Sequence, residues 1–211
     1  MNRREALRNI GLGTGYVVAA PTLLSILQSC SNEPTFQPQF LTPGQGFALQ
    51  QMTDLIIPSD DEVPGAKEVN IAEFIDSFWA QVPDEEDTAQ LKDAWAGFES
   101  KFKEEFNKEL TKGTAEDYTM MLDKYLKASP EDRAKYAELR QNYSDSDDPN
   151  VTMDPDAASF ELLGNIRGMT IWGWKTSEEV GENVLWYDPV PGQYVGCLPI
   201  SEAGNGKTMS L

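Results

Sequence analysis

The sequence predicts a mainly α-helical protein, in which a single helical domain is followed by an irregular C-terminal arm with at most short strands. Between about residues 42 and 171, apolar residues recur at intervals of three and four positions, which is the spacing of one helix face. The segments with this spacing begin at residues that favour helix N-caps, and several have Pro at the first helical position. Beyond Ile171 the spacing is lost, and Gly, Pro and aromatic residues become frequent.

Two helices are predicted at the start of the domain. The first follows Thr42, where Thr-Pro-Gly-Gln supplies an N-cap, a Pro at the first helical position and a capping box. Pro58 ends this helix. Its expected apolar face is Ala48, Met52, Leu55 and Ile56. The second helix follows Asn70, which we expect to cap it together with Glu73. Its expected apolar face is Ile71, Phe74, Ile75, Phe78 and Trp79.

Four further helices are predicted. The third carries an aromatic stripe opposite acids and lysines, and such a stripe is more typical of a protein core than of a cofactor site. The stripe consists of Leu91, Trp95, Phe98, Phe102 and Phe106. Acidic residues 85–87 are expected in the first turn of this helix, where the helix dipole favours them. The fourth helix starts at Thr114, a short and polar fifth at Ser129, and the sixth at Asp154.

The C-terminal arm, which starts at residue 172, is rich in aromatic residues. Short strands are expected at 184–187 and 194–198. The Trp and Tyr side chains pack either across the protein's own helices or against a partner. Both interpretations remain open, because these residue types are favoured in both places. The candidates for a partner interface are Trp172, Trp174, Trp186, Tyr187 and Tyr194.

The first 29 residues are identified as an export signal and are set apart from the fold. A positive head containing Arg3, Arg4 and Arg8 precedes an apolar stretch from residue 10 to residue 27. The run Asn-Arg-Arg-Glu-Ala-Leu-Arg resembles a twin-arginine signal, the type that exports proteins in a folded state. An ordinary secretion signal and an uncleaved membrane anchor are the alternatives, although the glycines and Pro21 make a poor spanning helix.

The apolar stretch ends in Leu-Gln-Ser-Cys, which resembles a lipobox. In such a motif the cysteine is acylated and becomes the new N-terminus, so we expect Cys30 to anchor the protein on the periplasmic side of the membrane. The alternative, a buried structural cysteine, fits poorly beside the run SNEPTFQPQ, which is typical of a flexible tether. The chain is therefore divided into a signal at 1–29, a lipidated tether at 30–40 and a helical domain at 41–211.

The composition restricts the function. The net charge of −18 argues against binding nucleic acid, whose phosphates need clustered Lys and Arg, and against adsorption to anionic lipid. The negative charge would steer a basic protein partner toward the chain, although the need for solubility alone explains most of this charge. The sequence contains no His, which excludes Ser-His-Asp and Cys-His catalysis, His-ligated haem and the usual zinc sites. Cys197, the only other cysteine, is buried, free or bonded to another chain.

The sequence contains no recognisable catalytic or cofactor motif. The acidic loop from Asp145 to Asp156 departs from the EF-hand pattern, because Pro149 and Asn150 stand where that pattern requires an acid or amide and a glycine. A looser calcium site and a solvated loop both remain open there. The only glycine cluster lies in the signal and lacks the last glycine of a dinucleotide fingerprint. We therefore assign no catalytic, cofactor-binding or metal-binding residues to this chain.

The chain resembles the gluconate 2-dehydrogenase subunit 3 family in two stretches, LTPGQGFALQQMTDLIIPSDDEVPGAKEVNIAEFID and GWKTSEEVGENVLWYDPVPGQYVGCLPISEAG. The distinctive parts are Ile57-Pro58, Pro64-Gly65-Ala66 and residues 191–199. The likeness extends from about residue 40 to residue 204, and residues 84–148 contribute least to it. A lipobox is not general in this family, so Cys30 suggests that this member carries its own anchor.

The resemblance implies a small, non-catalytic accessory subunit of a membrane-associated sugar or sugar-acid dehydrogenase. In such complexes FAD belongs to a large flavoprotein subunit of the glucose-methanol-choline type, and electrons leave through a cytochrome c. The small subunit is implied to supply the export signal and to support folding or docking of the large one, with Cys197 as a candidate for a bond between the subunits. A stand-alone carbohydrate-binding lipoprotein and a structural envelope protein are the alternatives.

Overall fold

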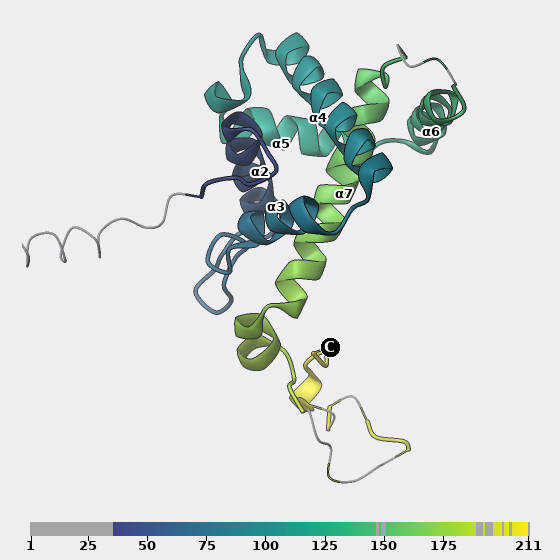
Figure 1. Cartoon of the computed structure of the whole chain (residues 1–211). Coiled ribbons are helices and arrows are strands. Elements are labelled where there is room, and N and C mark those ends of the chain that lie inside the picture. Colours follow the sequence, from purple (N-terminus) through teal and green to yellow (C-terminus); the bar gives the residue numbers. More distant parts are fainter. Residues whose placement is uncertain are drawn as a thin grey trace, which may run out of the picture. The chain divides into compact units, whose positions relative to one another are not determined.

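The structure, a computed structural model, describes residues 36–146, 148, 151–188, 192, 196–199, 201–202 and 204–210. Within these residues it is mainly α-helical, as predicted from the sequence (Figure 1). Residues Gln37–Leu211 group into one unit. Arg3, Arg4 and Cys30, which carry the predicted export signal and lipid attachment, lie outside the described residues.

Six α-helices and three shorter helical segments make up the described part of the chain. The α-helices are α2 (Pro43–Ile56), α3 (Ile71–Gln81), α4 (Glu85–Phe106), α5 (Ala115–Leu126), α6 (Pro130–Ser144) and α7 (Pro155–Thr176). The shorter segments are η1 (Leu110–Lys112), the π-helix η2 (Val180–Val184) and η3 (Gly204–Gly206). None of these helices is both long enough and apolar enough to span a membrane.

Helices α2 and α3 begin where the sequence predicts, but their N-termini differ. At α2 the capping box is present, because the Thr42 hydroxyl accepts from the Gln45 backbone N–H at 3.3 Å and the Gln45 side chain accepts from Thr42 N–H at 3.0 Å. Asn70 precedes α3 in the left-handed region, at φ 54°, and makes no side-chain cap. The predicted Asn70 cap is therefore wrong, since a capping side chain needs an extended backbone at that position.

The next three helices follow the sequence prediction with one difference in length. Residues 85–87 occupy the first turn of α4, and Thr114 forms a capping box with Asp117 at the start of α5. Helix α6 is polar, with Tyr136 as its one buried residue, but its fifteen residues make it longer than predicted. This length reflects the high helix propensity of Ala, Lys, Glu and Arg. Because these residues show no apolar spacing, the sequence pattern did not indicate how far the helix extends.

Helix α7 continues past Ile171, where the helical spacing in the sequence ends. It therefore includes Trp172 and Trp174, and the expectation that they belong to an irregular arm is wrong. The reason lies in the position of α7, which contacts α2, α3, α4, α5 and α6 (Figure 1). A helix with neighbours on several sides buries residues on several sides, so its apolar residues show no single face.

The segment after α7 contains less strand than predicted. The strand-like feature in its described residues is an isolated parallel bridge between Trp186 and Met209. The expected strand at 184–187 is therefore reduced to one bridged residue, and residues 180–184 are helical instead. Of the second expected strand, Gly196 to Leu198 are not in a strand, while Tyr194 and Val195 lie outside the described residues.

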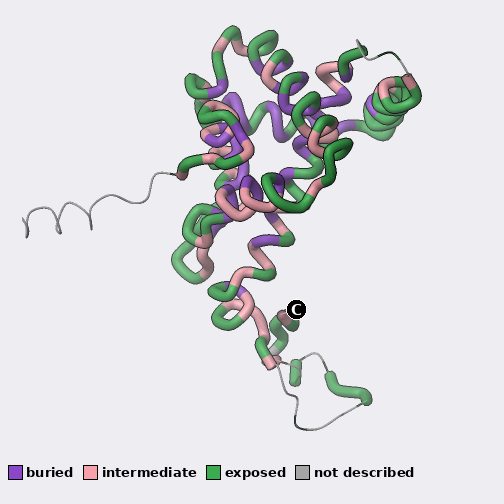
Figure 2. The backbone as a smooth tube through the Cα atoms, viewed as in Figure 1, coloured by how far each residue is buried: buried purple, intermediate pink, exposed green. Residues whose placement is uncertain are grey.

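The core lies between α7 and the helices that surround it, and Figure 2 shows buried backbone on the sides that face one another. The approach of α4 to α7 is close, because a Cβ on Gly97 would lie 2.4 Å from the Cβ of Ala158. Trp95, Phe98 and Phe102 of α4 are each at most 1% exposed. The prediction that the aromatic stripe belongs to the core is therefore confirmed for these three residues, whereas Leu91 and Phe106, at its two ends, are half-buried.

Candidate functional site

Three aromatic rings from two helices form a cluster at the surface, which we call the aromatic face: Phe74 and Phe78 on α3 and Trp172 on α7. The Trp172 ring centroid lies 5.3 Å from that of Phe74 and 5.7 Å from that of Phe78, the latter in an edge-on arrangement. Each such pair is worth about 0.5–1.5 kcal/mol beyond the burial of its rings. Trp172 is nevertheless 44% exposed, so it is placed where a partner can reach it.

The aromatic face depends on a close approach between α3 and α7. Gly173 is buried on α7, and a Cβ at this position would lie 2.7 Å from Cδ1 of Phe74. The missing side chain therefore lets the Phe74 ring lie against the α7 backbone. Phe78 follows Phe74 by four positions, which places both rings on the same side of α3.

Trp174 serves the protein's own packing. Its indole N–H donates a hydrogen bond to the carbonyl of Pro64 at 2.8 Å, and its ring is half-buried. Pro64 belongs to the loop between α2 and α3, which is closed by a 2.8 Å hydrogen bond from Ala66 N–H to the Ile57 carbonyl. The distinctive Pro-Gly-Ala motif thus joins this loop to α7.

An apolar groove of about 430 Å³ lies beside the aromatic face, between the end of α3, the start of α4 and the middle of α7. Trp79, Ala94 and Leu162 are buried and form its base, whereas Val82 is 60% exposed at its mouth. Phe78 belongs to both the groove and the aromatic face, so the two surfaces are continuous. The apolar lining is Phe78, Trp79, Val82, Pro83, Leu91, Ala94, Leu162 and Met169.

The sequence contained a signal for this groove that the prediction did not use. Phe74, Phe78 and Val82 are spaced by four positions, and the series continues past the last residue of α3. We assigned the first two to the core because apolar residues at this spacing usually are core residues. The structure leaves both half-buried and Val82 exposed.

Acidic residues lie beside the mouth of the groove. Residues 84–87 are all exposed at the start of α4, and Asp87 is part of the groove lining. Arg140 is the only Lys or Arg among the described lining residues, and its Nε lies 2.6 Å from the Glu161 carboxylate. The positive charge of Arg140 is therefore already paired, and the run 84–87 keeps a net negative charge.

The segment after α7 carries the remaining predicted interface residues. Backbone hydrogen bonds of 2.9 and 2.8 Å join Trp186 to residues 208–210, so the end of the chain lies beside it. Tyr187 is 49% exposed. Cys197 is exposed and has a free thiol, and Tyr194 lies outside the described residues.

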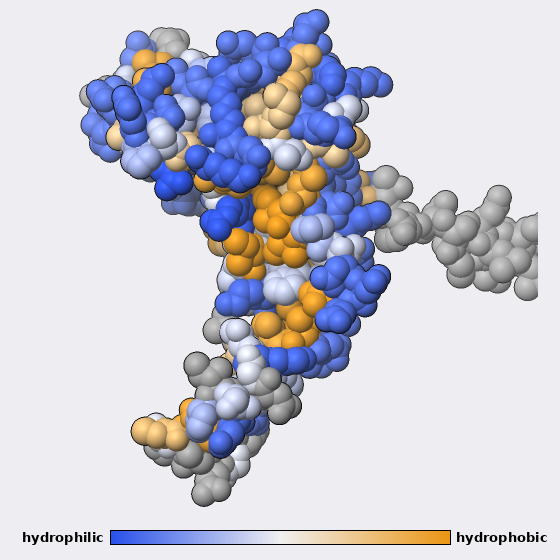
Figure 3. Space-filling view, turned by 180° about the vertical axis from the view of Figure 1, so that it is seen from behind, coloured by the Kyte–Doolittle hydropathy of each residue, from blue (hydrophilic) through white to orange (hydrophobic). Residues whose placement is uncertain are grey.

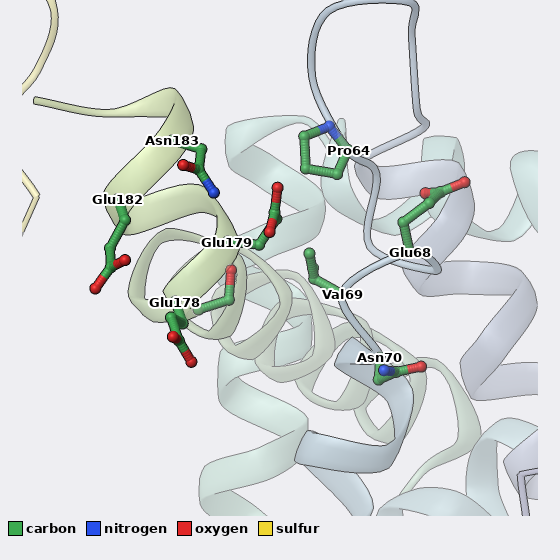
Figure 4. Close-up of a pocket in the computed structure, with 9 residues that line it drawn as sticks. Pro64, Glu68, Val69, Asn70, Glu178, Glu179, Glu182 and Asn183 are labelled. Atoms are coloured by element: carbon green, nitrogen blue, oxygen red, sulfur yellow. The ribbon is translucent and has the colours of Figure 1, made fainter.

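A second hollow lies between the loop before α3 and the segment after α7 (Figure 4). Its lining includes four acids, Glu68, Glu178, Glu179 and Glu182. In Figure 4, Glu179 points into the space between the two segments while the other three carboxylates point away from it. No group of three or more His, Cys, Asp or Glu suited to a metal ion occurs in the part of the chain that the structure describes. The four acids of this hollow are therefore not gathered into such a group.

Two acids of the predicted acidic loop, Asp154 and Asp156, take part in the fold. The Asp154 carboxylate caps α7 by accepting from Asp156 N–H at 2.9 Å. The Asp156 carboxylate lies 3.3 Å from Lys101 Nζ and accepts a hydrogen bond from the Tyr125 hydroxyl at 2.7 Å. Burial acts to raise the pKa of Asp156, but the Tyr125 hydrogen bond and the Lys101 charge outweigh it and keep this pKa below its usual range. Loop positions 147, 149 and 150 lie outside the described residues.

A buried acid that the sequence prediction did not single out holds the start of the domain. The Asp76 side chain accepts hydrogen bonds from the backbone N–H groups of Gln39 at 2.6 Å, Phe40 at 3.2 Å and Leu41 at 3.0 Å. Asp76 is only 1% exposed, and these donors satisfy a buried carboxylate that would otherwise be costly. The sequence did contain a sign of this role, because Asp76 follows Ile75 on the apolar side of the predicted helix.

A model of the gluconate 2-dehydrogenase subunit 3 family matches residues 43–192. The match begins with the first residue of α2 and contains the aromatic face, the apolar groove and the loop joined to Trp174, but it ends before Cys197. No curated protein and no solved structure matches the chain. Because the family model covers most of the sequence, the chain belongs to the gluconate 2-dehydrogenase subunit 3 family.

Proposed function

We propose that this chain is the small, non-catalytic subunit of an exported dehydrogenase complex whose large subunit is a glucose-methanol-choline flavoprotein. The observation that carries the proposal is the family match over residues 43–192. FAD and the oxidation of a sugar or sugar acid belong to the large subunit, and a cytochrome c receives the electrons. The small subunit supplies the export signal, the membrane anchor and a docking surface that supports folding of its partner.

The surface of the helical domain supports the docking role. Trp172 is exposed beside Phe74 and Phe78, and Trp is enriched among residues that dominate binding energies at protein interfaces. Figure 3 shows apolar side chains gathered along the middle of one face, between hydrophilic flanks. Contiguous apolar surface of this kind marks interaction sites on soluble domains. The absence of His in the sequence excludes Ser-His-Asp and Cys-His catalysis, which supports a non-catalytic role.

The N-terminal region supports export together with a folded partner. In this proposal the Arg3-Arg4 pair directs the complex to a route for folded proteins, and acylated Cys30 then holds it on the periplasmic side of the membrane. The route for folded proteins is explained if the partner acquires FAD and folds before export, and this chain carries the signal for both subunits. The hydrogen bonds of Asp76 to residues 39–41 attach the end of the tether to α3.

Purification of the full-length chain from native membranes tests the proposal. We expect a larger second subunit to copurify, with a flavin absorption spectrum and reduction of an electron-accepting dye that depends on an added sugar or sugar acid. The purified small subunit alone is expected to show neither flavin absorbance nor dye reduction. A colourless protein that copurifies with nothing contradicts the proposal, and sugar binding by that solitary protein would support the carbohydrate-binding alternative.

Two variants separate export from anchoring. Replacing both Arg3 and Arg4 with Lys is expected to retain both subunits in the cytoplasm, because the twin-arginine pair is lost while the positive charge is kept. Cys30→Ser is expected to release the complex from membranes into the soluble fraction, because the acylated sulfur is missing. Export that is unchanged in the double Lys variant indicates the ordinary secretion route instead.

A further inference from the structure

The apolar groove can accept side chains without rearrangement of the core. Its base is formed by the buried residues Trp79, Ala94 and Leu162, while the exposed Val82 and the half-buried Met169 lie higher on its walls. Its volume of about 430 Å³ is in the range of pockets that bind ligands or the anchor residues of a partner. An apolar side chain of a partner that entered the groove would be buried against apolar residues of three helices.

The negative charge around the groove indicates which kind of partner can bind there. Residues 84–87 present four consecutive exposed acids beside Pro83, and the single described cation of the lining, Arg140, is paired with Glu161. The dipole of α4 offsets only about half a unit of charge at its N-terminus. Anionic lipid and acidic segments are therefore repelled, whereas Lys and Arg side chains are attracted. A second copy of this chain would bring an equally acidic surface against this one.

We propose that this groove receives the apolar side of a basic amphipathic helix of the large subunit, with Lys or Arg of that helix meeting residues 84–87. The inference rests on the proposed function, which supplies the partner, and it assigns the part of the chain that binds. The groove lies between helices and is continuous with Phe78 and Trp172, so a bound helix would extend across the aromatic face.

A matched pair of variants tests the position of the site. Val82→Asp places a charge at the mouth of the groove, and Met120→Asp places the same charge at a residue of α5 that is 62% exposed and lies outside the groove. The flavoprotein recovered from the wild-type complex is titrated onto each full-length variant. We expect binding to weaken at least about tenfold for Val82→Asp and less than about twofold for Met120→Asp.

A second pair of variants tests the charge of the partner. Asp87→Lys reverses one charge in the groove lining, and Asp54→Lys reverses an exposed charge on α2. We expect Asp87→Lys to slow association and to reduce its dependence on salt, because a positive rim no longer steers a basic helix. Asp54→Lys is expected to retain the association rate and salt dependence of the wild type. Equal effects of the two variants overturn the charge assignment.

The outcomes distinguish this inference from the proposed function. If the wild-type chain brings no flavoprotein with it, both fail. If the wild type binds the flavoprotein and Val82→Asp binds it equally well, or Met120→Asp weakens binding as much, the inference alone is overturned. A photoreactive phenylalanine analogue at position 82 gives an answer that does not depend on the folding of the Asp variant. Crosslinks to a Lys- or Arg-rich helix of the flavoprotein support the proposal, and crosslinks only to a second copy or to the chain's own tether overturn it.

Discussion

Removing the carboxylate of Asp76 should detach the N-terminal segment of the domain and weaken the whole fold. This side chain is 1% exposed on α3 and accepts hydrogen bonds from the backbone N–H groups of Gln39, Phe40 and Leu41. In Asp76→Ala the three donors lose their acceptor, and Leu41 N–H is itself buried. In Asp76→Asn one acceptor oxygen remains, so part of the network is kept.

The size of the effect follows from the number and burial of these bonds. A hydrogen bond to a charged group contributes roughly 1.5–3 kcal/mol, and the lower end applies to Gln39 and Phe40, whose N–H groups are only partly buried. Because bonds to one carboxylate are not additive, we expect Asp76→Ala to lower the free energy of unfolding by about 3–4 kcal/mol. Asp76→Asn should cost roughly half as much. For a domain of this size, the larger loss corresponds to a fall in Tm of about 6–16 °C.

Urea unfolding of the mature chain, followed by circular dichroism, measures this loss, with the exposed Asp54→Ala on α2 as control. Limited proteolysis provides a local readout, since cleavage near residues 36–41 should become faster in the Asp76 variants. The reasoning is refuted if Asp76→Ala unfolds within about 1 kcal/mol of the wild type and shows the same cleavage pattern.

Three further predictions concern packing, charge and the free cysteine. Gly173→Ala should destabilise the protein by about 1–2 kcal/mol in urea unfolding, because its Cβ would lie 2.7 Å from the Phe74 ring while the gain in helix propensity offsets part of the cost. In Lys101→Met, the free energy of unfolding should begin to decrease at a higher pH than in the wild type as the solution is acidified. The folded-state pKa of Asp156 lies below its unfolded value, so its stabilisation is present above about pH 4 and is lost as pH falls through the folded pKa. Without the Lys101 charge, the pKa of Asp156 should move up from its lowered position, while the Tyr125 hydrogen bond and Lys124 still act to lower it, and stability curves measured between pH 7 and pH 3 should separate. Cys197→Ser should abolish a reductant-sensitive link to the large subunit on non-reducing gels, because the Cys197 thiol is exposed.

Each of these predictions has a control or a contrary result. Gly168→Ala is the matched control for Gly173→Ala, because a Cβ at Gly168 meets nothing within 4 Å and should leave stability equal or slightly higher. Superimposable pH profiles for the wild type and Lys101→Met would show that this lysine does not govern Asp156. A wild-type complex that migrates identically with and without reductant removes the intersubunit bond from the proposal.

The local chemistry of the chain was sufficient to predict where the helices begin. Thr42, Thr114, Ser129 and Asp154 all occupy N-caps with side-chain hydrogen bonds, because these short polar side chains satisfy the free N–H groups of the first turn. The middle of the aromatic stripe of α4 was equally predictable as core, since one side of that helix is apolar and the other is charged. In contrast, Asn70 did not cap α3, because its left-handed backbone is imposed by the preceding loop.

Long-range contacts determined the features on which the candidate site depends. Trp172 and Trp174 belong to one helix, yet the first joins the exposed aromatic face and the second donates a hydrogen bond to Pro64, 110 positions away in the chain. The apolar groove likewise exists only where α3, α4 and α7 meet. The sequence by itself determined the fold class and the helix starts, because these depend on neighbours within a few residues, and its motifs carried the likeness to the family. Which apolar residues stay at the surface was decided by the tertiary structure, because burial depends on which helices come together.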